Sequence, residues 1–180
     1  MKMIKNPAIS IVLCFLLIGV AASSINAQTA NINVKLSPLL ALTVNTPDVN
    51  INFNTLTDYQ NGVTVPMPGH LTVSSLLPYT VSVKANDATL SDAATTPNTM
   101  NVNIVTAVLT AGGTTGGTVA PATPLSNATA NPLVTLATPA LAKVLDVTYA
   151  VPSSVSNSAA VLGHPSGTYK TVVTYSIVNL

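Results

Sequence analysis

Apolar and polar residues alternate along most of the chain in short runs that turn-forming residues separate. In the last stretch, 169–178, the odd positions are mainly apolar, as at Tyr175 and Ile177, and Lys170, Thr174 and Ser176 between them are polar. Successive side chains of a strand point to opposite faces, so this stretch is predicted to be a strand with one apolar face. An apolar face needs a second layer to cover it, which indicates a sandwich.

The cleanest alternation lies at 49–54, where Val49, Ile51 and Phe53 are separated by asparagines. One apolar and one wet face is typical of an antiparallel strand. Further strands are predicted at 31–36, 39–44, 63–65, 71–75, 79–84, 100–108, 133–136 and 145–151. Pro66 and Pro68 favour an edge position for 63–65. Because Pro78 divides 71–75 from 79–84, these are either one bent edge strand or two tightly joined strands.

The segments between these runs are rich in turn and loop residues. Residues 58–62 end in Asn-Gly, 85–98 are polar, and 111–127 contain two Gly-Gly pairs. No helical periodicity extends beyond a turn or two. Short strands with regular turn signals predict an all-β fold, an Ig-like antiparallel β-sandwich with about eight or nine strands.

The first 27 residues have the features of an export signal. Lys2 and Lys5 precede a nearly unbroken apolar run, and Ala27 supplies the small residue of a cleavage site. The predicted organisation is a cleaved signal peptide at 1–27 and a single sandwich domain at 28–180. The mature protein would then be secreted, periplasmic or on the cell surface, with no membrane span.

Composition excludes several functions. The sequence has no arginine, glutamate or tryptophan, and its one cysteine, Cys14, lies in the predicted signal. The predicted mature chain therefore has no disulfide or thiolate site. It retains four lysines against five aspartates, a net charge of −1. A nucleic-acid partner is not expected, because binding nucleic acid requires a basic face.

The residues that could carry chemistry do not form a reactive pattern. His70 and His164 each adjoin a glycine and are predicted to be turn residues, since two histidines without a third ligand do not make a zinc site. Asp87 and Asp92 could bind calcium, but their spacing fits a solvated loop better than a calcium loop. No serine lies in a Gly-x-Ser-x-Gly context. We therefore predict a protein that is not an enzyme and has no catalytic, cofactor or metal residues.

Gly167 and Tyr169 stand at the start of the last predicted strand. A tyrosine at the start of a late strand of a sandwich can hydrogen-bond back to the preceding connection. We predict that these two residues form a tyrosine corner.

Three groups of residues resemble a known family. The 49–53 alternation, Gly69–Val73 with 78–83, and Ser166-Gly-Thr-Tyr169 before the last strand are similar to the exported Ig-like domains of the spore coat U and DUF4402 group. Those domains resemble fimbrial subunits of chaperone-usher systems. The resemblance implies a sandwich with an open edge that joins copies of itself or related subunits by strand addition. Residues 31–36 would then be the donor strand, with Ile32, Val34 and Leu36 as the inserted side chains.

Two functions are consistent with these observations. The first is an exported structural protein, a fimbria-like or coat subunit that assembles by β-strand addition. The alternative is a module that binds glycan or cell-wall material through the loops at 58–62 and 85–98.

Overall fold

The computed structural model describes residues 31–94, 96–110 and 116–180, so the predicted signal peptide at 1–27 lies outside the described residues. The chain divides into two units, Met1–Leu36 and Ser37–Leu180. In the first unit, residues 31–36 form neither helix nor strand. The strand predicted there is not formed, because alternation gives a strand only where its backbone groups find a ladder partner.

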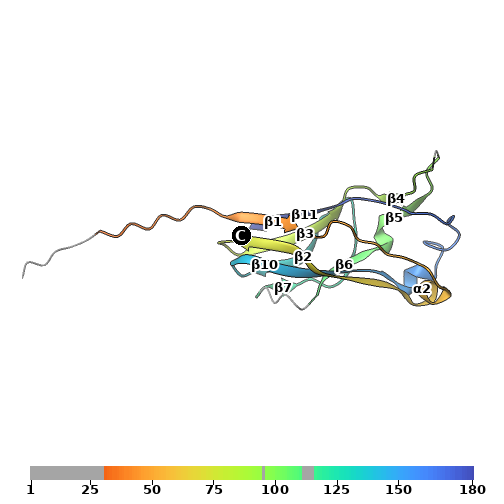
Figure 1. Ribbon diagram of the computed structural model, residues 1–180, viewed down its shortest axis with the longest axis horizontal. Coiled ribbons are helices and arrows are strands. Elements are labelled where there is room, and N and C mark those ends of the chain that lie inside the picture. Colours follow the sequence, from red (N-terminus) through yellow and green to blue (C-terminus); the bar gives the residue numbers. More distant parts are fainter. Residues whose placement is uncertain (1–30, 95, 111–115) are drawn as a thin grey trace, which may run out of the picture. The chain divides into compact units, whose positions relative to one another are not determined.

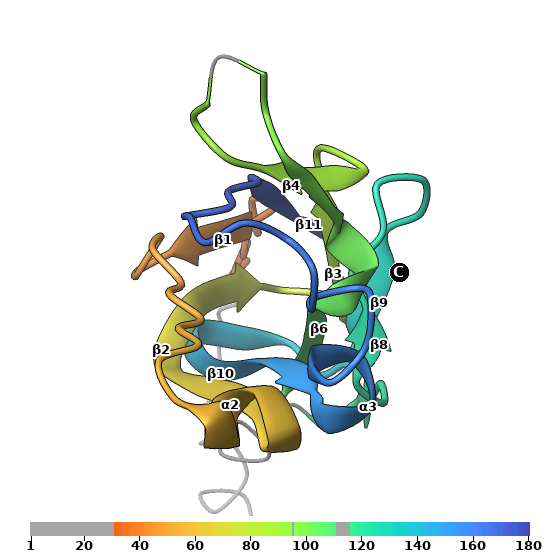
Figure 2. The same cartoon turned by 90° about the vertical axis from the view of Figure 1, so that its right-hand side faces the viewer.

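The second unit is an all-β, sandwich-like fold of antiparallel strands (Figure 1, Figure 2). The larger sheet has the order β1-β2-β10-β6-β8, formed by Leu40–Val44, Gly62–Ser75, Ala140–Pro152, Thr106–Leu109 and Thr123–Pro124. The second sheet has the order β11-β3-β9-β7, formed by Val173–Asn179, Tyr79–Ala85, Asn131–Ala137 and Thr118–Val119. A small ribbon pairs β4 (Thr89–Ser91) with β5 (Thr99–Asn101).

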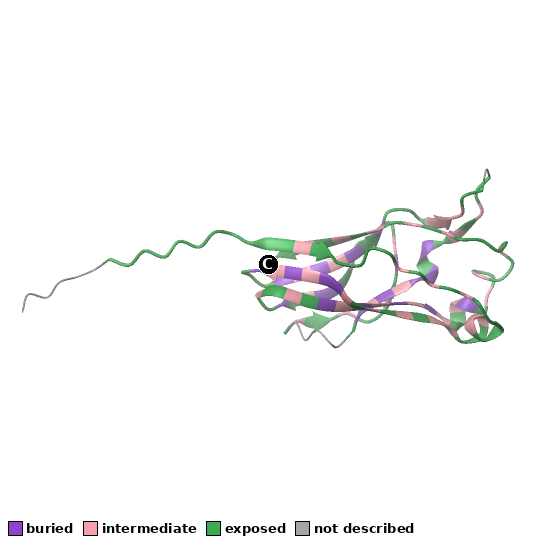
Figure 3. Ribbon diagram, viewed as in Figure 1, coloured by how far each residue is buried: buried purple, intermediate pink, exposed green. Residues whose placement is uncertain are grey.

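The core lies between the two larger sheets and follows the predicted alternation. Leu71 and Val73 of β2 and Val81 of β3 are fully buried, and the polar residues between them are more exposed (Figure 3). Residues 71–75 and 79–84 belong to different sheets, so the second of the two predicted arrangements is correct. Pro78 lies where the chain crosses between the layers.

Strand β2 is longer than predicted, because 63–65 continues through both prolines into 71–75. Pro66 lies opposite Thr148 of β10, whereas β1 pairs only with 71–75. The first part of β2 therefore has an open edge, where proline is tolerated.

The loop predicted at 58–62 is largely helix α2 (Leu56–Asn61). Thr55 caps the helix: its hydroxyl accepts a hydrogen bond from the Asp58 amide, and the Asp58 carboxylate accepts one from the Thr55 amide at 2.7 Å. These two bonds form a capping box. Gly62 ends the helix with φ of +78°, and a Cβ there would lie 2.3 Å from the Val151 carbonyl oxygen.

Two other predicted strands differ from the structure. The 100–108 strand is split into β5, a 3-10 helix (Val102–Ile104) and β6. A second short helix, α3 (Ser153–Ser156), follows β10. The clearest predicted strand, 49–54, has no ladder partner among the described residues, although its alternation of half-buried and exposed side chains is present.

Candidate functional site

Two stretches of the second unit place apolar side chains against the core without completing a sheet. One is 46–54, whose Val49, Ile51 and Phe53 are half-buried. The other is 161–172 with the following β11, where Val173 and Tyr175 are likewise half-buried. Residues 49–54 and 169–175 alternate half-buried and exposed side chains, as in a strand, whereas 161–168 consist mostly of turns and bends.

A groove of about 1,010 Å³ lies between these two stretches. Its walls are 47–54 on one side and 161–173 on the other, and its floor includes Tyr149 and Val151 of β10. The backbone of the 161–172 wall is hydrogen-bonded to 86–91. Lys170 exchanges two backbone hydrogen bonds with Ser91, and the Val172 carbonyl accepts one from the Asn86 amide. We define this feature as the edge groove. An extended polypeptide is the natural complement to a groove with a backbone edge on each side.

The floor of the edge groove contains a polar cluster of His70, Tyr149 and Tyr175. His70 Nε2 lies 2.9 Å from the Tyr175 hydroxyl, which also hydrogen-bonds the Tyr149 hydroxyl. His70 is 1% exposed and Tyr149 is 2% exposed. Burial lowers the pKa of His70 and raises the pKa of both tyrosines, so all three groups are neutral at physiological pH.

Two buried polar atoms that line the edge groove lack a hydrogen bond of ordinary geometry within the described residues. They are His70 Nδ1 and Thr171 Oγ1. Buried polar atoms in native structures are nearly always paired. For His70, a backbone hydrogen bond with Thr46 opposes the lowering of the pKa by burial, so Thr171 Oγ1 is the lining atom for which the described residues supply no partner.

The prediction that His70 is a turn residue is wrong. The Gly69 signal marks a bulge rather than a turn, since the β2 and β10 registers shift between Met67 and Leu71. Gly69 has φ of +63°, and its amide donates to the Asp146 carboxylate at 2.6 Å. This bulge turns both His70 and the next residue, Leu71, into the core.

His164 lies in a bend of the 161–172 wall and makes an edge-to-face contact with Tyr169. The Tyr169 hydroxyl donates to the Pro165 carbonyl oxygen at 2.8 Å, a back-bond of the kind that a tyrosine corner uses. The strand begins at Val173, later than predicted, so Gly167 and Tyr169 precede it. Their role as a corner stays a prediction.

The predicted donor residues Ile32, Val34 and Leu36 are 87%, 80% and 79% exposed. The candidate calcium loop is organised by its own residues, since the Asp92 carboxylate accepts bonds from the Asn98 side chain and from the Ala94 and Asn98 amides. These bonds lower the pKa of Asp92, the Asn98 side chain most strongly. Within the described residues, no three potential metal ligands form a cluster and no helix is long and apolar enough to cross a membrane.

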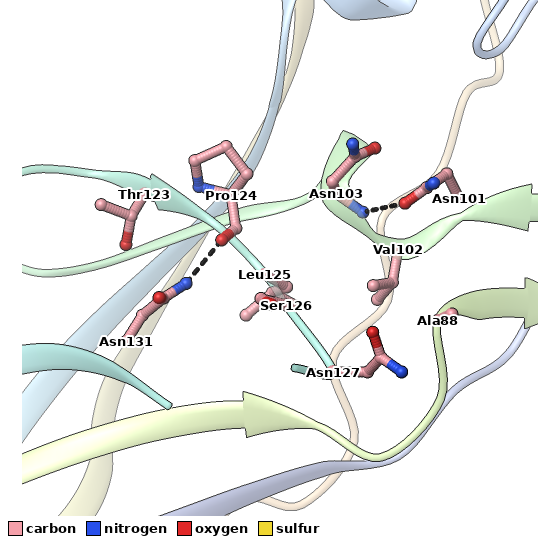
Figure 4. Close-up of a pocket in the computed structure, with 10 residues that line it drawn as sticks. All are labelled: Ala88, Asn101, Val102, Asn103, Thr123, Pro124, Leu125, Ser126, Asn127 and Asn131. Atoms are coloured by element: carbon pink, nitrogen blue, oxygen red, sulfur yellow. Dashed lines mark hydrogen bonds between the residues drawn. The ribbon is translucent and has the colours of Figure 1, made fainter. Parts of the chain in front are cut away.

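A smaller polar pocket of about 470 Å³ lies between the 3-10 helix and the chain that follows β8 (Figure 4). Four asparagines line it: Asn101, Asn103, Asn127 and Asn131. Asn131 donates to the Pro124 carbonyl oxygen, and the Asn101 side chain accepts from the Asn103 amide. The pocket contains no titratable group, so it could bind hydroxyl or amide groups but not perform acid-base chemistry.

Comparison with known proteins assigns no function to the groove or to the pocket. No protein-family model matches the chain, and no curated protein matches it significantly.

Proposed function

We propose that this protein is an exported, non-enzymatic structural subunit that assembles by β-strand addition. Residues 31–36 of one copy would enter the edge groove of another. The observation that supports this most directly is the groove itself, whose lining includes two stretches with the burial alternation of a strand, 49–54 and 169–173. The signal peptide expected at 1–27 would bring the subunit to the periplasm or cell surface.

The proposed donor has the pattern that the edge groove requires. Ile32, Val34 and Leu36 share one face, and Asn31, Asn33 and Lys35 share the other. An extended segment of six residues is about 20 Å long at ~3.3 Å per residue. Inserted between 46–54 and 164–172, it would place its apolar side chains on the core, and its backbone could offer a partner to Thr171.

Val34→Asp tests this assembly. Burying a valine contributes about 1.5–3 kcal/mol, and the aspartate would also lose hydration. At 1.4 kcal/mol per tenfold change, self-association should weaken by roughly 30-fold or more. Asn33→Asp is the matched control, because it adds the same charge to the outward face and should leave association within about threefold.

Sedimentation velocity of the mature chain over a range of concentrations measures both variants. Deleting 28–36 should leave a monomer. A wild-type chain that stays monomeric at all concentrations would contradict the proposal. An equal loss of association in Asn33→Asp and Val34→Asp would also contradict it, because the effect would then follow charge and not insertion.

The asparagine-lined pocket favours a second candidate function, the binding of glycan or cell-wall material. Amide side chains are suitable partners for sugar hydroxyl groups. Asn103→Ala and Asn127→Ala should then release the protein from an insoluble cell-wall fraction that retains the wild-type chain. If neither variant changes retention, this second function is wrong.

A further inference from the structure

One end of the sandwich carries a group of exposed leucines that take no part in the proposed strand addition. Leu40 lies opposite Ser75, which also lies opposite Ala140, and Tyr79 lies opposite both Ala137 and Asn179. The Leu180 amide bonds the Pro78 carbonyl, and the Leu76 amide bonds the Leu39 carbonyl. These pairings bring seven leucines to the same end of the second unit. They are Leu39, Leu40, Leu76, Leu77, Leu136, Leu141 and Leu180, and we call them the leucine end.

The leucine end is apolar and partly strained. Leu77, Leu136, Leu141 and Leu180 are each more than half exposed, and no charged residue occurs in 37–42, 74–80, 136–142 or 178–180. The described residues include two non-glycine positions with positive φ, and both belong to this end: Leu136 at 53° and Ala142 at 51°. Exposed apolar patches mark interaction sites, and strained backbone is concentrated at functional sites.

The sequence places the leucine end close to the proposed donor. Only Ser37 and Pro38 separate Leu36 from Leu39, so these two Cα atoms are at most about 11 Å apart. If 31–36 occupies another copy's edge groove, the donor's leucine end must therefore lie at one end of that groove.

The recipient's edge groove lies toward the α2 end of β2, the end opposite Ser75 and the leucine end. At the recipient's own leucine end, β1 lies beside β11 (Figure 2), and none of 37–42, 74–80, 136–142 and 178–180 lines the groove. At the opposite end its lining includes Tyr59 of α2 and residues 161–164. Leu56 is 73% exposed and Leu162 is 44% exposed on these two elements.

We propose that the leucine end of each subunit packs against the Leu56 and Leu162 end of the subunit that receives its donor strand. The inference rests on the proposed function and adds a second interface to it. Because the two surfaces are different, each copy carries one of each kind, and the contact joins copies head to tail in a ring or an open filament. It also explains why apolar side chains are exposed at both ends of the sandwich.

The test keeps donor and groove intact and alters the leucine end alone. In Leu77→Ser with Leu141→Ser, two exposed side chains change, so folding should be unaffected. We expect self-association, measured by sedimentation velocity, to weaken at least tenfold. Binding of a fluorescent peptide of residues 28–36 to the variant should stay as in wild type. The control is Val144→Ser, a 49% exposed site on β10, which should assemble normally.

The readouts separate failure of this inference from failure of the proposed function. If the leucine variant assembles as wild type, the inference is wrong and strand addition stands. If the peptide does not bind the wild-type protein either, strand addition fails and the inference fails with it.

Cysteine pairing gives a measurement independent of stability, because Cys14 in the predicted signal is the only native cysteine. Mixed Leu77→Cys and Leu56→Cys copies should form a disulfide-linked pair on oxidation. Preferential linkage of Leu77→Cys copies to each other would show that two leucine ends meet, and would overturn the proposed contact.

Discussion

Tyr175→Phe is the most informative single perturbation of the groove floor. The substitution removes one hydroxyl and keeps the ring, so the packing of β11 on the core changes little. That hydroxyl is the hydrogen-bond partner of both His70 Nε2 and the Tyr149 hydroxyl. The substitution would therefore leave two buried groups, His70 Nε2 and the Tyr149 hydroxyl, without this partner.

The expected loss follows from the number of buried groups left unpaired. Leaving one buried polar group without a partner costs about 1–3 kcal/mol, and here two groups are affected. We expect the free energy of unfolding to fall by about 2–4 kcal/mol. By contrast, Tyr169→Phe removes one bond, to the Pro165 carbonyl, at a more open position. Its loss should be about 0.5–1.5 kcal/mol.

Urea unfolding of the two variants beside wild type measures these differences. Adding His70→Phe to Tyr175→Phe should recover part of the loss, because the imidazole with its unpaired Nε2 is then removed. If Tyr175→Phe lowers the free energy of unfolding by less than Tyr169→Phe does, the cluster is not the buried hydrogen-bonded unit described here.

Two further predictions concern the scaffold around the groove. Burial lowers the pKa of His70 in the folded state. In the unfolded chain the pKa of this histidine is about 6.5, so as the pH falls the unfolded chain binds the proton first. The free energy of unfolding should therefore be constant above about pH 7.5 and should fall as the pH drops through ~6.5. Urea unfolding at pH 8 and pH 5.5 measures this difference, which should be smaller in His70→Phe than in wild type. Gly62→Ala should lower the free energy of unfolding by more than about 2 kcal/mol, because a Cβ would clash with the Val151 carbonyl and φ is +78°. A melting temperature equal to that of wild type would contradict this prediction. Gly163→Ala, where a Cβ meets nothing within 4 Å, is the control for positive φ alone.

The fold class was predictable from the sequence because burial alternates with period two. In β2, β3, β10 and β11 the predicted inward side chains are the buried or half-buried ones. The alternation did not show which segments would pair. Residues 49–54 have the clearest pattern in the chain, yet pairing depends on neighbours far away in sequence, and the described residues offer them none.

The polar part of the groove could not be predicted because it depends on a bulge. A glycine before a histidine is typical of turns, and Gly69 indicated one. In the structure the same residue supplies positive φ within β2, where the Asp146 carboxylate binds its amide. A predicted strand on each side of Gly69 was the available signal, since a glycine between two strand runs also fits a bulge.

The walls of the edge groove favour the proposed strand addition over the binding of a small molecule. Ligand clefts enclose most of the surface of a small molecule. In this groove 49–54 on one wall and 169–173 on the other alternate half-buried and exposed side chains. An occupant must then match a repeat of two residues on both sides at once. A strand does so, and 31–36 has that repeat with its apolar side chains exposed. An occupant with any other spacing would leave either the backbone edges or the apolar floor uncovered.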